Sequence, residues 1–81
     1  MNNKNLAVDS SARYRIRAQG FLHEALSEML AGMEIDVSSV KDDVMITSLT
    51  GRMRDQAELI GVLNCLYEMH LPLVSVEFLG P

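Results

Sequence analysis

The stretch from Asp55 to Phe78 constrains the fold most, because it reads as a helix, a stop and a strand in direct succession. Asp55 and Glu58 have the spacing of a capping box, which marks a helix start. Pro72 biases the residue before it away from helical angles and therefore predicts the stop. The helical stripe comprises Gln56, Leu59, Ile60, Leu63, Leu66 and Tyr67, and the strand 73–79 places Val74, Val76 and Phe78 on one face.

One residue inside this predicted helix has a low helix propensity. Gly61 costs about 1 kcal/mol relative to alanine in a helix interior. We therefore expect another backbone to approach the helix closely at Gly61.

The N-terminal half also predicts one strand and one helix, with the strand first. Residues 13–19 alternate strictly, with Tyr14, Ile16 and Ala18 on one face and Arg13, Arg15, Arg17 and Gln19 on the other. This alternation is typical of a half-buried strand. A helix of about ten residues follows, and Gly32 is placed to end it. Its predicted buried stripe is Leu22, Ala25, Leu26, Met29 and Leu30.

The middle of the chain predicts a β-hairpin. Residues 33–38 alternate as a second strand, residues 38–43 are a polar turn, and residues 44–50 are a β-branched third strand. The third strand could bury either of its faces. Val44 and Ile46 form one face, and Met45, Thr47 and Leu49 form the other. If the second set pointed outward, it would add apolar character to the open face of the sheet.

The order strand, helix, strand, strand, helix, strand predicts an α+β fold, the ferredoxin-like β-α-β-β-α-β sandwich. Its four-stranded antiparallel sheet would have the order 4-1-3-2, with two helices on one face. We expect a single domain over residues 13–81, preceded by a flexible N-terminal tail over residues 1–12. A chain of 81 residues lies near the lower limit of independent stability, which favours a partner chain.

Composition narrows the functional classes. The net charge of -4 argues against broad nucleic-acid binding. No apolar run is long enough to span a bilayer, and the first residues lack the apolar core of a secretory signal. The single cysteine, Cys65, cannot form an internal disulfide. These features together predict a cytoplasmic protein.

The chemically reactive residue types do not form a recognisable site. His23 and His70 have no ligand or dyad partner at a usable spacing, so we interpret them as surface or helix-end residues. Cys65 falls in the C-terminal half of its helix, which does not favour a reactive thiolate, and is interpreted as structural. Phosphate-binding glycine motifs are absent from the sequence. We therefore expect no enzymatic activity, no metal and no cofactor.

The candidate interaction surface is the arginine row, defined as Arg13, Arg15, Arg17 and Gln19. It has three functional interpretations: an anion-binding face, a nucleic-acid face, and a dimer surface. Few aromatic residues are available to stack on bases, so nucleic acid ranks below self-association. The plain structural alternative is a solvated face of cross-strand ion pairs.

Four segments resemble a group of small, uncharacterised bacterial proteins. They are YRIR at 14–17 with Gly20 and Leu22, LTG at 49–51, DQAELIGVL at 55–63 and LPLVSVE at 71–77. The combination D-Q-A-x-L-x-G with L-P-L-x-S-V carries most of the specificity. The chain departs from the group at His23, where an acidic helix cap is expected. The resemblance implies a stand-alone domain and brings no activity or cofactor.

The function expected from the sequence is a non-enzymatic module that binds itself, as a homodimer, or another protein through its sheet face. The alternative is an ACT-like regulatory domain that binds a small anionic metabolite near the arginines. The loop at 19–23 lacks the Pro-Gly sequence typical of ACT domains, which weakens this alternative.

Overall fold

The computed structural model describes residues 6–81, except for the side chains of residues 38, 39 and 41. Residues 1–5 of the predicted tail lie outside the described residues. The elements are β1 (Ala12–Gln19), the 3-10 helix η1 (Glu24–Leu30), β2 (Glu34–Lys41), β3 (Val44–Met53), α1 (Gln56–Glu68) and β4 (Leu73–Gly80).

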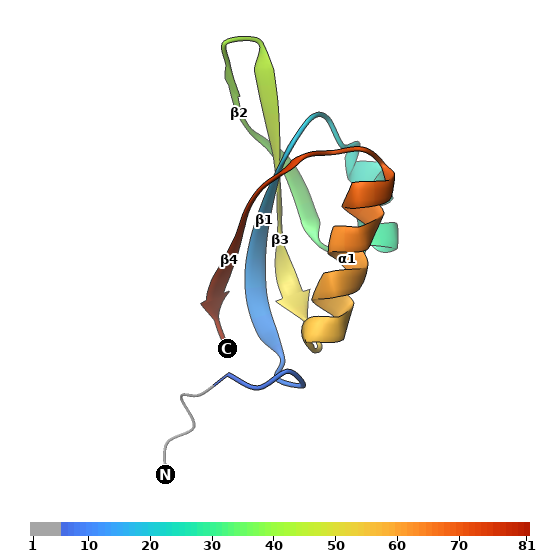
Figure 1. Ribbon diagram of the computed structural model, residues 1–81, viewed down its shortest axis with the longest axis vertical. Helices are drawn as coiled ribbons and strands as arrows, with labels where there is room; N and C mark the ends of the chain where they lie inside the picture. The colour runs from blue at the N-terminus through green and yellow to red at the C-terminus, as the bar shows by residue number, and fades with distance from the viewer. Residues whose placement is uncertain (1–5) are drawn as a thin grey trace.

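The four strands form one antiparallel sheet in the order β2-β3-β1-β4, which is the predicted order 4-1-3-2 read from its other edge. Both helices lie on the same side of this sheet, and the opposite side is uncovered (Figure 1). The predicted α+β class is thereby confirmed. β1 and β3 occupy the centre of the sheet, and β2 and β4 are its edges.

The helix side of the two central strands carries the core. Ile16 of β1 lies opposite Leu49 of β3, and both are fully buried. Thr47 is also buried, at 1% exposure, and its hydroxyl donates to the carbonyl oxygen of Gly20. The face of β3 that carries Thr47 and Leu49 is therefore the covered one. Of the two alternatives left open by the sequence, this set is the covered one and adds no apolar character to the open face.

The hairpin between β2 and β3 is longer and tighter than predicted. Its turn consists of Asp42 and Asp43, with φ values of 53° and 65°. Two successive positive φ values are typical of the type I′ turn, whose twist matches that of the strands it joins. Residues 38–41 and 51–53, predicted as turn and connection, are therefore strand residues.

The first helix differs from its prediction in type and in its buried face. η1 is a seven-residue 3-10 helix, and its tighter winding takes Ala25 and Met29 off the buried stripe. Met29 is 61% exposed, whereas Leu30 is fully buried. The helix begins at His23, whose Nδ1 accepts a hydrogen bond of 3.0 Å from the Ala25 N–H. His23 thus acts as the N-cap that an acidic residue was expected to provide in relatives.

The start of α1 is confirmed as a carboxylate cap. Asp55 Oδ1 accepts from the N–H of Glu58 at 2.9 Å, and Glu58 Oε1 accepts from the N–H of Arg54 at 2.8 Å. The returning bond reaches the residue before the cap rather than the cap itself. The carboxylate of Glu58 therefore anchors the chain that enters the helix.

The end of α1 comes before Pro72 and has a different cause. The N–H groups of His70 and Leu71 donate to the carbonyl oxygens of Tyr67 and Leu66 in the pattern of a Schellman motif. His70 holds the positive φ, 61°, that this motif requires. The chain has left the helix by the time it reaches Pro72, so the assignment of the stop to Pro72 is wrong.

The buried face of α1 is rotated from the predicted stripe. Leu59, Val62 and Leu66 are buried, whereas Ile60 and Tyr67 are exposed. Gly61 is exposed as well, and a Cβ atom there would meet nothing within 4 Å. The expected close approach of another backbone at Gly61 is therefore wrong.

Part of the segment before β1 makes defined contacts. The carbonyl oxygen of Val8 accepts a hydrogen bond of 2.9 Å from the N–H of Gln56 at the start of α1. Ser10 closes a turn onto Ala7 through its backbone N–H. Strand β1 then begins at Ala12, one residue before the predicted domain boundary.

Candidate functional site

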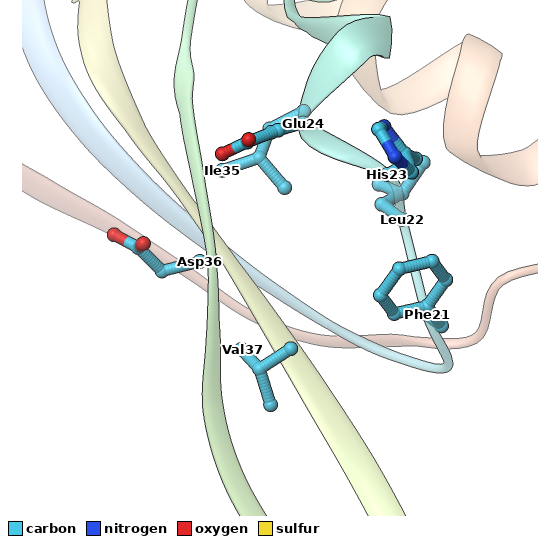
Figure 2. Close-up of a pocket in the computed structure, with 7 residues that line it drawn as sticks. All are labelled: Phe21, Leu22, His23, Glu24, Ile35, Asp36 and Val37. Atoms are coloured by element: carbon cyan, nitrogen blue, oxygen red, sulfur yellow. The ribbon is translucent and has the colours of Figure 1, made fainter.

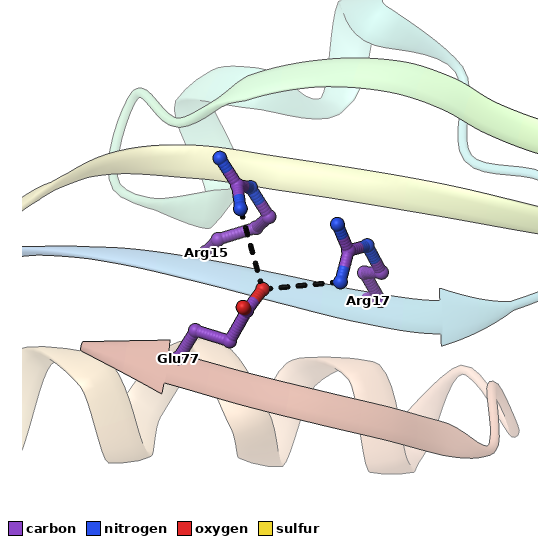
Figure 3. A network of polar contacts seen from close by, with 3 residues as sticks. All are labelled: Arg15, Arg17 and Glu77. Atoms are coloured by element: carbon purple, nitrogen blue, oxygen red, sulfur yellow. Dashed lines mark hydrogen bonds and ion pairs between the residues drawn. The ribbon is translucent and has the colours of Figure 1, made fainter. Parts of the chain in front are cut away.

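The arginine row lies on the open face of the sheet, as the alternation of β1 predicts. The register places Arg15 opposite Glu77 of β4, and one carboxylate oxygen of Glu77 accepts from both Arg15 and Arg17. The Nη1 to Oε1 distances are 3.4 Å and 3.1 Å (Figure 3). Two members of the row therefore have an acceptor within the chain.

The other two members of the row are exposed and lie at its ends. Arg13 lies opposite Arg52 of β3, so two guanidinium side chains start from neighbouring positions on the open face. Arg52 itself donates to Ser11 Oγ and to a main-chain oxygen of Pro81. Gln19 lies opposite Ile46 at the far end of the strand. The arrangement separates an ion-paired centre from a cationic end.

A buried hydroxyl adjoins the ion-paired centre. Ser75 lies opposite Arg17 on the same face of the sheet. Its Oγ is buried and has no hydrogen-bond partner within the described part of the chain. A hydroxyl group in this position can still accept or donate if a further polar group reaches it.

A shallow pocket of about 290 Å³ lies between the loop after β1 and strand β2. Phe21 and His23 stand edge to face on the loop side, with ring centroids 6.3 Å apart. Glu24 and Asp36 supply its charge, and Asp36 points away from the side of β2 that carries Ile35 (Figure 2). The lining holds two carboxylates and no arginine, so this pocket does not suit an anionic metabolite.

The apolar side chains of β4 on the core side of the sheet are only partly covered. Phe78 lies opposite buried Tyr14 in the register, and Val76 lies opposite buried Ile16. Val74, Val76 and Phe78 nevertheless remain 52%, 39% and 51% exposed. Phe78 makes an edge contact with the Tyr14 ring at 5.9 Å between centroids. These three apolar side chains are therefore about half covered, although they share a face with the core.

Two residues extend this partly covered surface toward α1. Tyr67 and Leu73 are exposed and line the same hollow of about 190 Å³ between the end of α1 and the start of β4. The β4 margin is defined here by its five residues: Tyr67, Leu73, Val74, Val76 and Phe78. The opposite open face contains no comparable group of exposed apolar side chains among the described residues.

The remaining reactive side chains have structural positions. His23 caps η1, and His70 occupies the left-handed position after α1. Cys65 is half-buried and packs against the core. Among the described residues, no three His, Cys, Asp or Glu side chains converge as metal ligands do. Within residues 6–81, no helix combines the length and apolar character needed to cross a membrane.

Comparison with protein families gives a match over residues 13–77, to the family described as Domain of unknown function (DUF8691). The chain belongs to this family. No curated protein and no solved structure matched the chain. The resemblance to an uncharacterised family is confirmed at this level. The matched range includes the whole arginine row and every residue of the β4 margin except Phe78.

Proposed function

We propose that this small α+β domain is a non-enzymatic self-association module that forms a homodimer through the β4 margin. One observation carries the proposal: Val74, Val76 and Phe78 continue the core side of the sheet and yet are about half exposed. Contiguous exposed apolar side chains rimmed by polar residues are typical of protein interaction sites. The proposal moves the expected contact surface from the arginine row to the edge of the sheet.

A standard interface would take a substantial share of the surface of so small a chain. A standard interface buries about 800 Å² on each partner, roughly a seventh of the 5479 Å² that this chain exposes. The β4 margin lies along one complete edge strand with the end of α1 beside it. Burial of its side chains would remove apolar area from water at about 25 cal/mol per Å². A small domain gains proportionately more from such burial than a large one.

Two finer assignments accompany this proposal. We assign the ferredoxin-like topology, supported by the element order and the sheet order β2-β3-β1-β4. We also assign the cytoplasm as the compartment, supported by the sequence-based argument from Cys65.

The second candidate function is the binding of a small anionic ligand, as in an ACT-like regulatory domain. Arg13 opposite Arg52 favours it, because the two cationic side chains start side by side on the open face. The bonds from Arg15 and Arg17 to Glu77 weigh against the centre of the row as the site. A thermal-shift screen of anionic metabolites, with Arg13→Ala as control, tests this second function. If no compound raised the melting temperature, anion binding would be excluded.

Light scattering across a concentration series tests the self-association proposal. The unmodified chain should pass from monomer to dimer as its concentration rises. Val76→Lys should shift this equilibrium strongly toward monomer, because a charge in an apolar contact must be desolvated. Val40→Lys is the matched control, since Val40 is an exposed valine on the opposite edge strand. A chain that stays monomeric at millimolar concentration would exclude the proposal.

A further inference from the structure

We infer that the partner at the β4 margin is β4 of a second copy, paired antiparallel about a twofold axis at Val76, so that two sheets become one. This inference rests on the proposed self-association and adds its geometry. In this geometry the second copy binds both the outer backbone edge of β4 and its exposed apolar side chains.

The outer edge of β4 is suited to pairing with another strand. β4 is an eight-residue strand at the end of the sheet, and its ladder runs to β1. Natural edge strands are protected by lysine, proline, bulges or inward-pointing charges. Residues 73–80 contain no lysine and no proline. Their one charge, Glu77, is bound to two arginines, so it offers little protection.

The other edge of the sheet differs. β2 carries two exposed carboxylates, Glu34 and Asp36, on its open face. Its register with β3 shifts between Val37 and Ser39, which marks a bulge or irregularity. Carboxylates and bulges both disfavour further strand pairing, and the register shifts of β4 against β1 lie only toward its ends, outside residues 75–78. The contrast between the two edges indicates β4 as the strand that accepts a partner.

Side-chain matching selects the register. A twofold axis in an antiparallel pair places one residue opposite its own copy. With Val76 at the axis, Val74 lies opposite Phe78 of the second copy, and all three apolar residues of this face meet. Glu77 then lies opposite Ser75 of the second copy on the other face. Pairs of aromatic and β-branched side chains are among the favourable cross-strand pairs.

The neighbouring registers are less favourable. An axis at Glu77 would place two carboxylates directly opposite each other, which is destabilising. An axis at Ser75 would move Phe78 opposite Pro72 of the second copy, beyond the end of the strand. The register of β4 with β1 shifts at both ends and is regular over residues 75–78, a segment that contains Val76. The axis therefore falls in the regular part of the strand.

The same register supplies the polar group that Ser75 lacks. The Oγ of Ser75 is buried without a hydrogen-bond partner in the described part of the chain. Residues directly opposite in an antiparallel pair have Cβ atoms about 4.5–5.5 Å apart. Rotation of the Ser75 side chain would then bring its hydroxyl within reach of the Glu77 carboxylate of the second copy. Each dimer would contain two such contacts, one on either side of the axis.

Disulfide trapping tests this register. In a Cys65→Ser background, V76C places two thiols at the axis, where opposite Cα atoms are about 4.5–5.5 Å apart, within disulfide range. V74C is the matched control, because its two copies lie four residues apart along the strands, about 13 Å. After mild oxidation, most of the V76C chains and few of the V74C chains should run as covalent dimers on a non-reducing gel.

A double variant and light scattering separate the outcomes. V74C/F78C should cross-link, because residue 74 of one copy meets residue 78 of the other. If the chain dimerises and V76C does not cross-link, the register is overturned and self-association stands. If V74C alone cross-links efficiently, the register is overturned as well. If the reduced chain is monomeric at every concentration, both the register and the proposed function fail.

Discussion

Val76 lies directly opposite Ile16 in the register of β4 with β1, yet Ile16 is fully buried and Val76 is 39% exposed. The two side chains share one face of the sheet, and only the first of them is fully covered. This difference between paired positions indicates that the apolar side of β4 is the surface that a partner would cover.

The pair also gives the first prediction. Ile16→Ala should lower the free energy of unfolding by about 2–5 kcal/mol, because it leaves a cavity in the core. Val76→Ala should cost less than about 1 kcal/mol in dilute protein, because the side chain that it truncates is already half exposed in the monomer. Urea denaturation of both variants checks this. If Val76→Ala were as costly as Ile16→Ala in the monomer, Val76 would belong to the core.

Thr47 provides a prediction about a buried hydrogen bond. Thr47→Val keeps the shape of the side chain and removes the hydroxyl that donates to the Gly20 carbonyl oxygen. It should destabilise the domain by about 1–3 kcal/mol, because the Gly20 carbonyl oxygen loses its partner in a partly buried place. Thr47→Ser retains the donor and should recover the part of the loss that comes from the hydrogen bond. Equal costs for both variants in chemical denaturation would contradict this role.

Two glycines should respond oppositely to the same substitution. Gly61→Ala should stabilise the domain by about 0.5–1 kcal/mol, because alanine prefers the helix and the added Cβ meets nothing within 4 Å. Gly51→Ala should destabilise it, because its Cβ would lie 3.2 Å from Met33 Cα and 3.3 Å from Met33 Cγ. Thermal unfolding of both variants measures the two shifts. A lower melting temperature for Gly61→Ala would show a contact at that position, for instance in the dimer.

The sequence was informative where a pattern is local. The alternation of residues 13–19 predicted the faces of β1, and the spacing of Asp55 and Glu58 predicted the start of α1. The element order predicted the order of strands in the sheet.

The sequence was less informative where tertiary packing decides. Apolar spacing on α1 does not reveal that Val62 is buried while Ile60 faces solvent, because both residues border the same stripe. The exposure of Val74, Val76 and Phe78 depends on how far the helices extend across the sheet. One available signal was the excess width of the apolar stripe on α1. A helix with more apolar residues than its core contact needs leaves some of them for another contact.

The end of η1 provides a further test of backbone conformation. Ala31 closes this helix with φ of 59°, a left-handed conformation that costs a residue with a Cβ about 1–2 kcal/mol. Ala31→Gly should therefore stabilise the domain by up to about 1 kcal/mol. Ala25→Gly is the matched control inside η1 and should be destabilising, because glycine loses more backbone freedom there. Differential scanning calorimetry should show melting temperatures that move in opposite directions.

Glu77 links the ion-paired centre of the arginine row to β4, and Glu77→Gln tests what its charge contributes. The three side chains are 35–41% exposed in the single chain, so the loss of both ion pairs should cost no more than about 1 kcal/mol in dilute, monomeric protein. Because salt screens exposed charges, the cost should shrink when urea denaturation is repeated in about 1 M salt. Glu34→Gln is the control, since Glu34 lies on the same face but is separated from β1 by β3. A cost that is several-fold larger and insensitive to salt would show that Glu77 has a buried partner, as in a dimer where it also meets Ser75.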